Sequence, residues 1–204
     1  MATATNAPAP TLIVSVQRVM RLLEAVNSHP DVAPAKQLAR EALAHRRDAI
    51  GVPVYFAVYR EGEIEIVAVA DTPYAPAVAE WADFRETGHA HALGQCLLSQ
   101  LDEQGRSDHL DRHPVQLVTP CSVSDRRALL ERLASTERMQ TVVERQEYAL
   151  GTVCAAIPIT VGSGAAVMGI SLPLHQEERL LPAVEQLRDA IGGLLGSIAF
   201  SISI

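Results

Sequence analysis

The sequence ERQEYALGTVCAAIPITVGSGAAVMGISLP, residues Glu144–Pro173, decides the fold class of this chain. It contains two apolar runs on either side of a glycine-rich turn at Val161–Gly164. Short apolar runs bounded by turn signals are typical of mostly buried strands, and the turn between them predicts a β-hairpin. We therefore expect at least one pair of adjacent core strands in the C-terminal half of the chain.

Polar side chains interrupt this hairpin region at Glu144, Cys154 and Ser171. Their neighbours are small, and Gly169 allows another group to approach the backbone of its strand closely. A concave apolar surface with a few convergent polar groups is the usual description of a small-molecule site. In such a site, Glu144 would attract a cationic or hydroxylated ligand. The alternative is a plain core hairpin in which Cys154 and Ser171 only fill space.

The composition is that of an ordinary globular protein, with 204 residues, 48% of them hydrophobic and 20% charged. No apolar run is long enough for a transmembrane helix, and the N-terminal residues lack the pattern of a secretory signal. Three cysteines without CxxC spacing favour reduced thiols over a disulfide framework. These features predict a cytoplasmic protein without a membrane partner.

The formal charge of −7 is distributed unevenly. Residues 1–50 hold six basic and four acidic side chains, a net charge of +2. Residues 51–204 hold eleven basic and twenty acidic side chains, a net charge of −9. Because phosphate binding needs clustered Lys and Arg, the long acidic part is excluded as a general nucleic-acid surface.

The N-terminal part divides into a tail and a short helical region. Residues 1–11 are small and proline-containing, which predicts a disordered tail. Residues 12–27 and 34–44 have the apolar spacing of two helices, joined by a polar turn. Such a pair resembles the opening of a helix-turn-helix unit; a pair of packing or dimerisation helices is the alternative. A recognition helix is missing, because strand-like sequence begins at Pro53.

The rest of the chain, residues 50–204, predicts one domain of mixed helices and strands. Apolar periodicity and turn signals give its elements. Beside the hairpin, they are strands at 53–59 and 63–70, a loop at 71–88, and helices at 89–101, 102–112, 125–138 and 177–204.

Two groups of side chains are possible metal ligands. His89, His91 and Cys96 are close in sequence, but residues two apart on a helix point to different sides. His109 and His113 share a helix face, but their segment is highly polar, and we expect it to be exposed. We therefore predict neither a metal site nor a cofactor.

Cys154 is a candidate nucleophile if His89 or His91 lies close enough to act as its base, and Glu144 is a candidate acid or base. The alternative is a small buried thiol, which is usually inert. We assign no catalytic residue, and a small metabolic or biosynthetic enzyme that uses the same pocket is the alternative function.

Four stretches, in order, resemble the effector domain of IclR-type bacterial transcriptional regulators. HAHALGQCLLSQL resembles the family signature H-A-T-A-L-G-K-A-L-L, and VTPCSVSDRRALLERL resembles L-T-x-x-T-I-T-x-x-x-x-L-x-x-x-L. EYALGTVCAAIPI resembles E-x-x-x-G-x-x-C-x-A-x-P-V, and GISLPL resembles the S-x-S-G-P-type strand after it. At the N-terminus, SVQRVMRLLEAV and APAKQLARE resemble the first two helices of the family's winged helix-turn-helix.

The resemblance implies an α/β (α+β) fold with a GAF-like effector-binding domain over residues 50–204. Such a domain has a central antiparallel sheet flanked by helices and a cavity on one side of the sheet. The resemblance also implies a small organic effector, either a carboxylate or an aromatic metabolite, and self-association into a dimer or tetramer. The expected ligand-binding residues are His91, Gly94, Glu144, Cys154, Gly169 and Ser171.

The chain departs from the family pattern in three respects. His91 stands where the pattern has Thr, and Gln95 stands where it has Lys. Gly169 removes one hydroxyl from the S-x-S strand. After Arg40, the recognition helix and wing are missing, so residues 12–49 are interpreted as a truncated helix-turn-helix and linker helix. We therefore expect the protein to act through mixed oligomers with a full-length paralogue, or by sequestering its effector, rather than by binding DNA alone.

Overall fold

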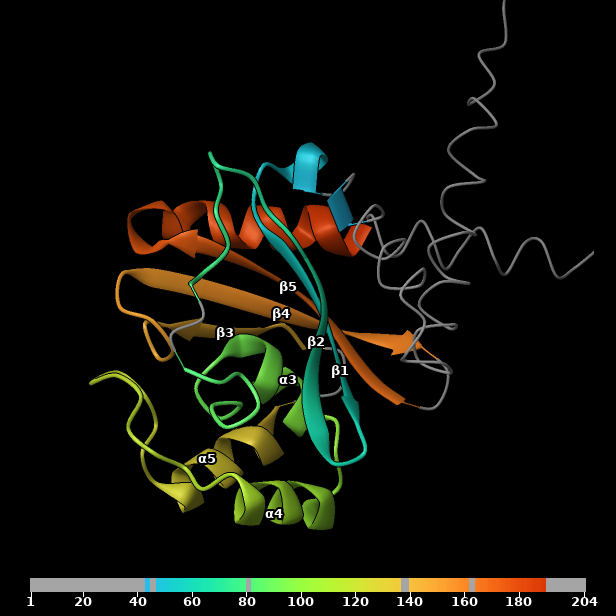
Figure 1. The fold of residues 1–204 in the computed structure, drawn as a ribbon, viewed down its shortest axis with the longest axis vertical. Helices are drawn as coiled ribbons and strands as arrows, with labels where there is room; N and C mark the ends of the chain where they lie inside the picture. The colour runs from blue at the N-terminus through green and yellow to red at the C-terminus, as the bar shows by residue number, and fades with distance from the viewer. Residues whose placement is uncertain (1–42, 45–46, 80–81, 137–139, 162–163, 190–204) are drawn as a thin grey trace, which may run out of the picture.

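The computed structural model describes residues 43–44, 47–79, 82–136, 140–161 and 164–189. Within these residues, five strands form one sheet in the order β2-β1-β5-β4-β3, and each neighbouring pair is antiparallel. Helices lie on both sides of this sheet (Figure 1). The fold class expected from the sequence, a central antiparallel sheet flanked by helices, is confirmed. The elements are β1 (Val54–Arg60), β2 (Glu63–Ala70), α3 (Ala92–Ser99), α4 (Glu103–Arg112), α5 (Arg126–Ser135), β3 (Val142–Arg145), β4 (Thr152–Val161), β5 (Gly164–Pro173) and the 3-10 helix η1 (Leu174–Arg179).

The predicted hairpin is present as β4 and β5, which pair over their full lengths from Thr152↔Pro173 to Val161↔Gly164. β5 also pairs with β1, so the last of the described strands lies in the middle of the sheet. Successive side chains on a strand point to opposite faces. Accordingly, Val153 and Ala155 belong to one apolar cluster, whereas Ala156 belongs to another on the opposite face.

One face of the sheet is covered by the C-terminal helix, which continues from η1 through residues 180–189 (Figure 1). Leu180, Val184 and Leu187 recur at helical spacing, and each is only 1% exposed. They pack into the apolar cluster that includes Val153 and Ile170. The helix predicted at 177–204 is present over residues 180–189, and residues 190–204 lie outside the described residues.

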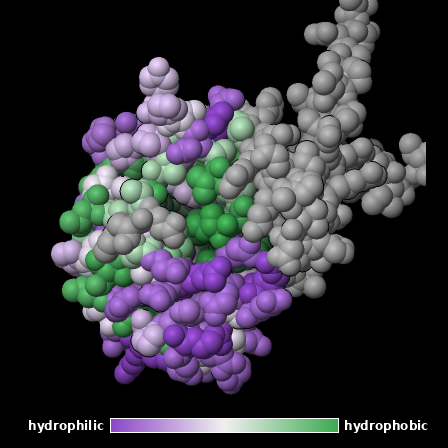
Figure 2. Space-filling view, viewed as in Figure 1, coloured by the Kyte–Doolittle hydropathy of each residue, from purple (hydrophilic) through white to green (hydrophobic). Residues whose placement is uncertain are grey.

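The other face is covered by α3, with α4 and α5 beneath it (Figure 1). Leu93, Cys96 and Leu97 of α3 pack against Val167 of β5 and the neighbouring apolar side chains of this face. A third cluster joins the far side of α3 to the two outer helices, through Leu98, Leu110, Leu129 and Leu133. Figure 2 shows hydrophilic side chains over the part of the surface formed by α4 and α5.

Helix α3 begins later than predicted. His91 is its N-cap, with Nδ1 accepting a hydrogen bond from the backbone N–H of Gly94 at 2.9 Å. His89 and His91 therefore precede the helix, and the prediction that placed both residues on it is wrong. The start of α5 is capped by Asp125, whose carboxylate accepts a hydrogen bond from Ala128 N at 2.8 Å.

The expectation that His109 is exposed is also wrong. Although α4 is a polar helix, His109 is only 1% exposed. Its Nδ1 lies 3.4 Å from the hydroxyl of Tyr59 and 3.4 Å from the carbonyl oxygen of Gly62. The histidine is buried because the β1–β2 turn packs on this face of α4, where Arg112 also donates to Gly62 O at 2.6 Å.

The tail at 1–11 and the helix at 12–27 lie outside the described residues, as does all of 34–44 except residues 43 and 44. The truncated helix-turn-helix therefore stays a prediction. In the part of the chain that the structure describes, no helix combines the length and the apolar character needed to cross a membrane.

Candidate functional site

Three of the expected site residues form one row across the sheet. Glu144 on β3 lies directly opposite Cys154 on β4, which lies directly opposite Ser171 on β5. Directly opposed residues point to the same face of a sheet. This is the face covered by α3, because Ala156, two residues from Cys154, packs there. The polar positions that interrupt the predicted hairpin region are thus neighbours in space.

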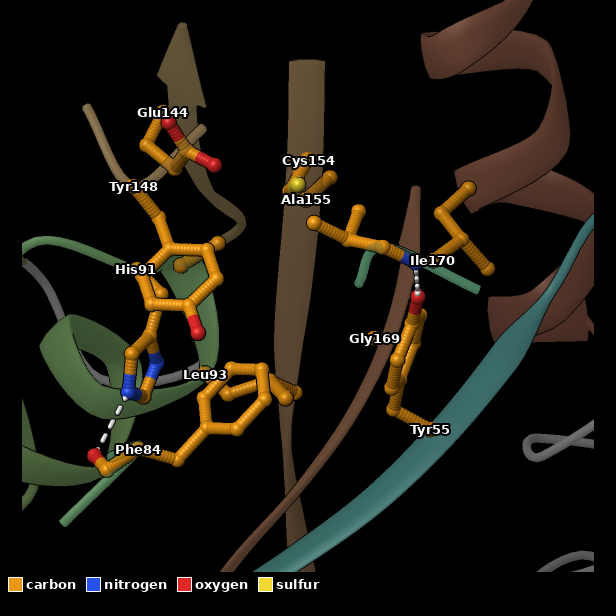
Figure 3. Close-up of a pocket in the computed structure, with 12 residues that line it drawn as sticks. Tyr55, Phe84, His91, Leu93, Glu144, Tyr148, Cys154, Ala155, Gly169 and Ile170 are labelled. Atoms are coloured by element: carbon orange, nitrogen blue, oxygen red, sulfur yellow. Dashed lines mark hydrogen bonds between the residues drawn. The ribbon is translucent and has the colours of Figure 1, made fainter. Parts of the chain in front are cut away.

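A small cavity of about 30 Å³ lies between this row and α3. Figure 3 shows Glu144, Tyr148 and His91 on one side, Tyr55 on the other, and Cys154 and Ala155 between them. Four of the six expected residues line the cavity: His91, Glu144, Cys154 and Gly169. Gly94 and Ser171 are not part of its lining.

Three rings form an aromatic wall on one side of the cavity (Figure 3). Phe84 stacks on Tyr148 with ring centroids 4.8 Å apart and an interplanar angle of 17°. The His91 ring meets both edge-on, at 4.8 Å from Phe84 and 5.8 Å from Tyr148. Stacked and edge-to-face pairs are the favoured aromatic geometries, so the three rings hold one another in place. An aromatic wall of this kind suits an apolar or aromatic ligand.

His91 is held by the backbone through both ring nitrogens. Nδ1 accepts from Gly94 N at 2.9 Å, so it carries no proton. Nε2 lies 2.9 Å from the carbonyl oxygen of Phe84 and must therefore donate to it. Burial lowers the pKa of His91 to about 4, which keeps the imidazole neutral. The residue positions Phe84 and starts α3, while its ring forms part of the cavity wall.

Glu144 is buried at 1% exposure, and no cation among the described residues acts on its pKa. Its Oε2 accepts a hydrogen bond from Glu147 N at 2.8 Å, whereas Oε1 is buried with no hydrogen-bond partner among the described residues. Burial raises the pKa of Glu144 to about 7, although hydrogen bonds from the Cys154 thiol and from Glu147 N act in the opposite direction. The cavity thus contains a carboxyl group that gains or loses its proton near neutral pH.

Cys154 has the properties of an inert thiol. Burial, followed by the neighbouring charge of Glu144, raises its pKa well above the ordinary value for cysteine. A nucleophilic cysteine needs the opposite shift. The two histidines considered as its base are occupied by backbone groups, with His89 Nε2 2.8 Å from Gln116 O. These contacts do not support the enzymatic alternative.

Ser171 does not line the cavity itself but is hydrogen-bonded to Tyr55, which does. The two hydroxyls are 2.9 Å apart, and the Tyr55 oxygen also accepts from the backbone N–H of Val78 at 2.8 Å. Tyr55 and Val78 line the cavity, so this pair of bonds closes one side of it with the loop after β2. On the other side of this closure, Ser171 lines a wider surface groove together with Tyr74 and Leu150.

Gly94 and Gly169, the two glycines among the expected site residues, each allow close packing against a neighbouring group. A Cβ on Gly94 would lie 2.2 Å from the carbonyl oxygen of Gly88, so this glycine allows α3 to touch the preceding backbone. A Cβ on Gly169 would lie 2.6 Å from Leu93 Cδ2 and 3.0 Å from Ala155 O. Gly169 therefore permits close packing of Leu93 on the sheet, where the family pattern has a serine.

In the described residues, no group of three or more His, Cys, Asp or Glu side chains could hold a metal ion. Cys96 is fully buried, and burial raises its pKa to about 12. His109 and His113 do lie together, with ring centroids 4.8 Å apart, but His113 Nε2 is paired with Glu63 Oε2 at 2.8 Å. Cys96 therefore packs in the core, while His109 and His113 contact each other and His113 also contacts Glu63.

Sequence reasoning did not identify Tyr55, Phe84 or Tyr148 as lining residues. Tyr55 had one usable signal, because it alternates with Ala57 and Tyr59 on one face of its strand. Phe84 and Tyr148 lie in irregular segments, where periodicity gives no information.

Replacing Tyr55 with phenylalanine is expected to loosen the closure formed with the loop after β2. The change removes the acceptor of the Val78 N–H and the partner of Ser171, at a cost of about 1 kcal/mol in the free energy of unfolding. Amide hydrogen exchange should become faster at Val78, while amides in β4 keep their protection. Unchanged exchange at Val78 would show that this bond does not hold the loop.

Residues 28–203 match the family described as "Bacterial transcriptional regulator IclR C-terminal". The p-hydroxybenzoate hydroxylase transcriptional activator of Acinetobacter baylyi is 25% identical over 115 residues, which are 56% of this chain and 41% of that protein. The chain therefore spans less than half the length of this relative.

Solved structures show the same fold at low identity. An IclR homolog from Microbacterium hydrocarbonoxydans complexed with 4-hydroxybenzoate gives a TM-score of 0.66 at 21% identity, covering 89% of this chain and 69% of that one. The inducer-binding domain of the PobR transcription factor from Acinetobacter, a double mutant complexed with 3-hydroxybenzoic acid, gives 0.57 at 20% identity, covering 74% and 95%. With the family match over residues 28–203, the sheet, the flanking helices and the cavity lead to one conclusion: this chain belongs to the IclR family of bacterial transcriptional regulators, through its C-terminal domain.

Proposed function

We propose that this chain is the effector-binding part of a transcriptional regulator, and that its effector is a small aromatic or carboxylate metabolite bound between α3 and the sheet. The observation that carries the proposal is the cavity itself, with an aromatic wall beside a buried carboxyl group whose Oε1 has no partner among the described residues. Buried polar atoms without a partner are uncommon, and this oxygen belongs to a residue that lines a cavity.

The relatives support the chemical class of the effector. Two solved structures of the same fold hold a hydroxybenzoate, and a curated relative is named for p-hydroxybenzoate hydroxylase. An aromatic ring suits the aromatic wall of Phe84, His91 and Tyr148. In this proposal, Glu144, Cys154 and Gly169 face the ligand with the His91 ring, Ser171 acts through Tyr55, and Gly94 acts only through the position of α3.

The proposal extends to assembly and to transcription. We propose that the chain self-associates as a dimer or tetramer. We also propose that the effect of ligand binding in the cavity is transmitted through that assembly. Residues 50–204 bind the effector, while DNA is recognised by a complete winged helix-turn-helix in a partner of the same family. A salt-titrated binding assay on DNA from around its own gene tests this division; tight, specific retention by the purified chain alone would overturn it.

Isothermal titration calorimetry with 4-hydroxybenzoate and with benzoate tests the site. We expect binding by the wild-type chain, and a loss of roughly fivefold or more in affinity for Cys154→Ala and for Ser171→Ala. Cys121→Ala is the matched control, because Cys121 is an exposed thiol outside the cavity lining. Affinity unchanged by both cavity substitutions would show that the ligand binds elsewhere.

A further inference from the structure

Almost all polar side-chain atoms that line the cavity are already bonded to the protein. The Tyr55 hydroxyl meets Ser171 and Val78 N, and the Tyr148 hydroxyl donates to Ala82 O at 2.7 Å. His91 uses both ring nitrogens. Among the lining oxygen and nitrogen atoms of the described side chains, Glu144 Oε1 is buried without a partner. For a ligand that enters the cavity, this oxygen is the hydrogen-bond acceptor that is still available.

The charged groups around Glu144 do not neutralise it. On its own strand, Arg145 is exposed on the opposite face and pairs with Glu177. From the turn after β3, the Glu147 carboxylate adds repulsion, and Arg132 of α5 is bonded to Glu147 at 2.8 and 3.0 Å.

The remaining neighbours of Glu144 are uncharged. β4 contributes the Cys154 thiol, and the start of α3 contributes neutral His91 and the amide of Gln95, which is bonded to His89 O and Glu147. The described residues that line the cavity include neither Lys nor Arg. The ionised form of Glu144 therefore depends on hydrogen-bond donors, and three of them are in place: the Cys154 thiol and the backbone N–H groups of Glu147 and Tyr148.

We propose that Glu144 selects ligands that bring a hydroxyl or amine donor to Oε1, and that this donor binds the ionised carboxylate, so that ligand affinity rises with pH. The inference rests on the proposed function and deepens it, because it names what the ligand must offer and couples its binding to a proton. The donor N–H or O–H of the ligand replaces the proton of Glu144, which is released to solvent. A ligand without a donor gains nothing from ionisation and leaves a buried charge unpaired.

Phenol and anisole are the probes for this coupling. The two share one ring, but only phenol can donate, and neither titrates in the range used. From about pH 5.5 to about pH 8.5, phenol affinity for the wild-type chain should rise roughly 30-fold, because only the ionised fraction of Glu144 binds it. Anisole affinity should stay constant or fall. Calorimetry in buffers of different ionisation enthalpy should show proton release on phenol binding at pH 7.

Two variants separate this coupling from a general effect of pH on the fold. In Glu144→Gln, the pH dependence of phenol affinity should disappear. In Cys154→Ala, one donor to the carboxylate is lost, so the midpoint of the dependence should move to higher pH. Phenol affinity that is independent of pH, equal pH dependence for anisole, or unchanged dependence in Glu144→Gln each overturns the proposal. If hydroxybenzoates bind but one of these three results is obtained, the proton coupling at Glu144 is wrong and the effector-binding function stands. If no compound binds at any pH, the coupling and the effector-binding function both fail.

Discussion

Replacing Gly94 with alanine is expected to destabilise the domain by about 3 kcal/mol or more in the free energy of unfolding. The added Cβ would lie 2.2 Å from Gly88 O, 2.6 Å from Gly88 Cα and 2.7 Å from Gly88 C. All three are backbone atoms, so the clash cannot be relieved by rotating a side chain. α3 would have to move away from the segment that carries His89 and His91, and the cavity wall would move with it.

Chemical denaturation followed by circular dichroism measures this loss. Gly88→Ala is a graded comparison: its Cβ would meet the flexible end of Ile64 at 2.4 Å, so the loss should be smaller. Gly105→Ala in α4 is the matched control. Its nearest contact is the Asp102 side chain at 3.0 Å, and alanine favours helix, so its stability should stay within about 1 kcal/mol of wild type. A Gly94→Ala protein as stable as Gly105→Ala would show that α3 does not need this contact.

Gly94 also shows the limit of sequence reasoning. A glycine within a helical signature fits a ligand approaching the helix as well as a backbone approaching it, and the family resemblance favoured the ligand. The structure places the backbone of Gly88 there. What separates the two interpretations is the path of residues 82–91, and that segment has no periodic signal from which its path could be predicted.

The polar row was more accessible from the sequence. Residues 144–173 contain a strong hairpin pattern, and alternation within each strand limits which side chains can share a face. The sequence pattern therefore identified Glu144, Cys154 and Ser171 together. In the structure, Cys154 lies directly opposite both Glu144 and Ser171. The aromatic wall could not be predicted in this way, because Phe84 and Tyr148 meet through the tertiary packing of two irregular segments. The burial of His109 was missed for the same reason, since it depends on the β1–β2 turn packing onto a polar helix.

Glu144→Gln is expected to stabilise the unliganded domain at alkaline pH and to leave it unchanged in acid. Burial raises the pKa of the Glu144 carboxyl from 4.5 to about 7, so the folded state holds its proton where the unfolded chain has lost it. The contribution of this group to stability is therefore fully present below pH 4.5 and is lost as pH rises to about 7. Above that range, the buried charge costs about 3 kcal/mol, which the neutral amide avoids.

The whole pH profile of the wild-type protein cannot isolate this effect, because buried histidines act in the opposite direction. Burial lowers the pKa of His91 and of His109 from 6.5 to about 4, so their contribution to stability is lost as pH falls through that range. The difference in unfolding free energy between Glu144→Gln and wild type cancels the histidine contributions. That difference should grow from near zero at pH 4.5 to about 3 kcal/mol above pH 7.

Glu178→Gln provides the matched control, since Glu178 is an exposed carboxyl on η1. Its difference from wild type should stay near zero at every pH. A constant difference for Glu144→Gln across the pH range would mean that the residue acts only through its shape and its bond to Glu147 N. A difference that grows with pH would show that the domain keeps a destabilising carboxyl in its cavity, as expected of a group retained for binding rather than for folding.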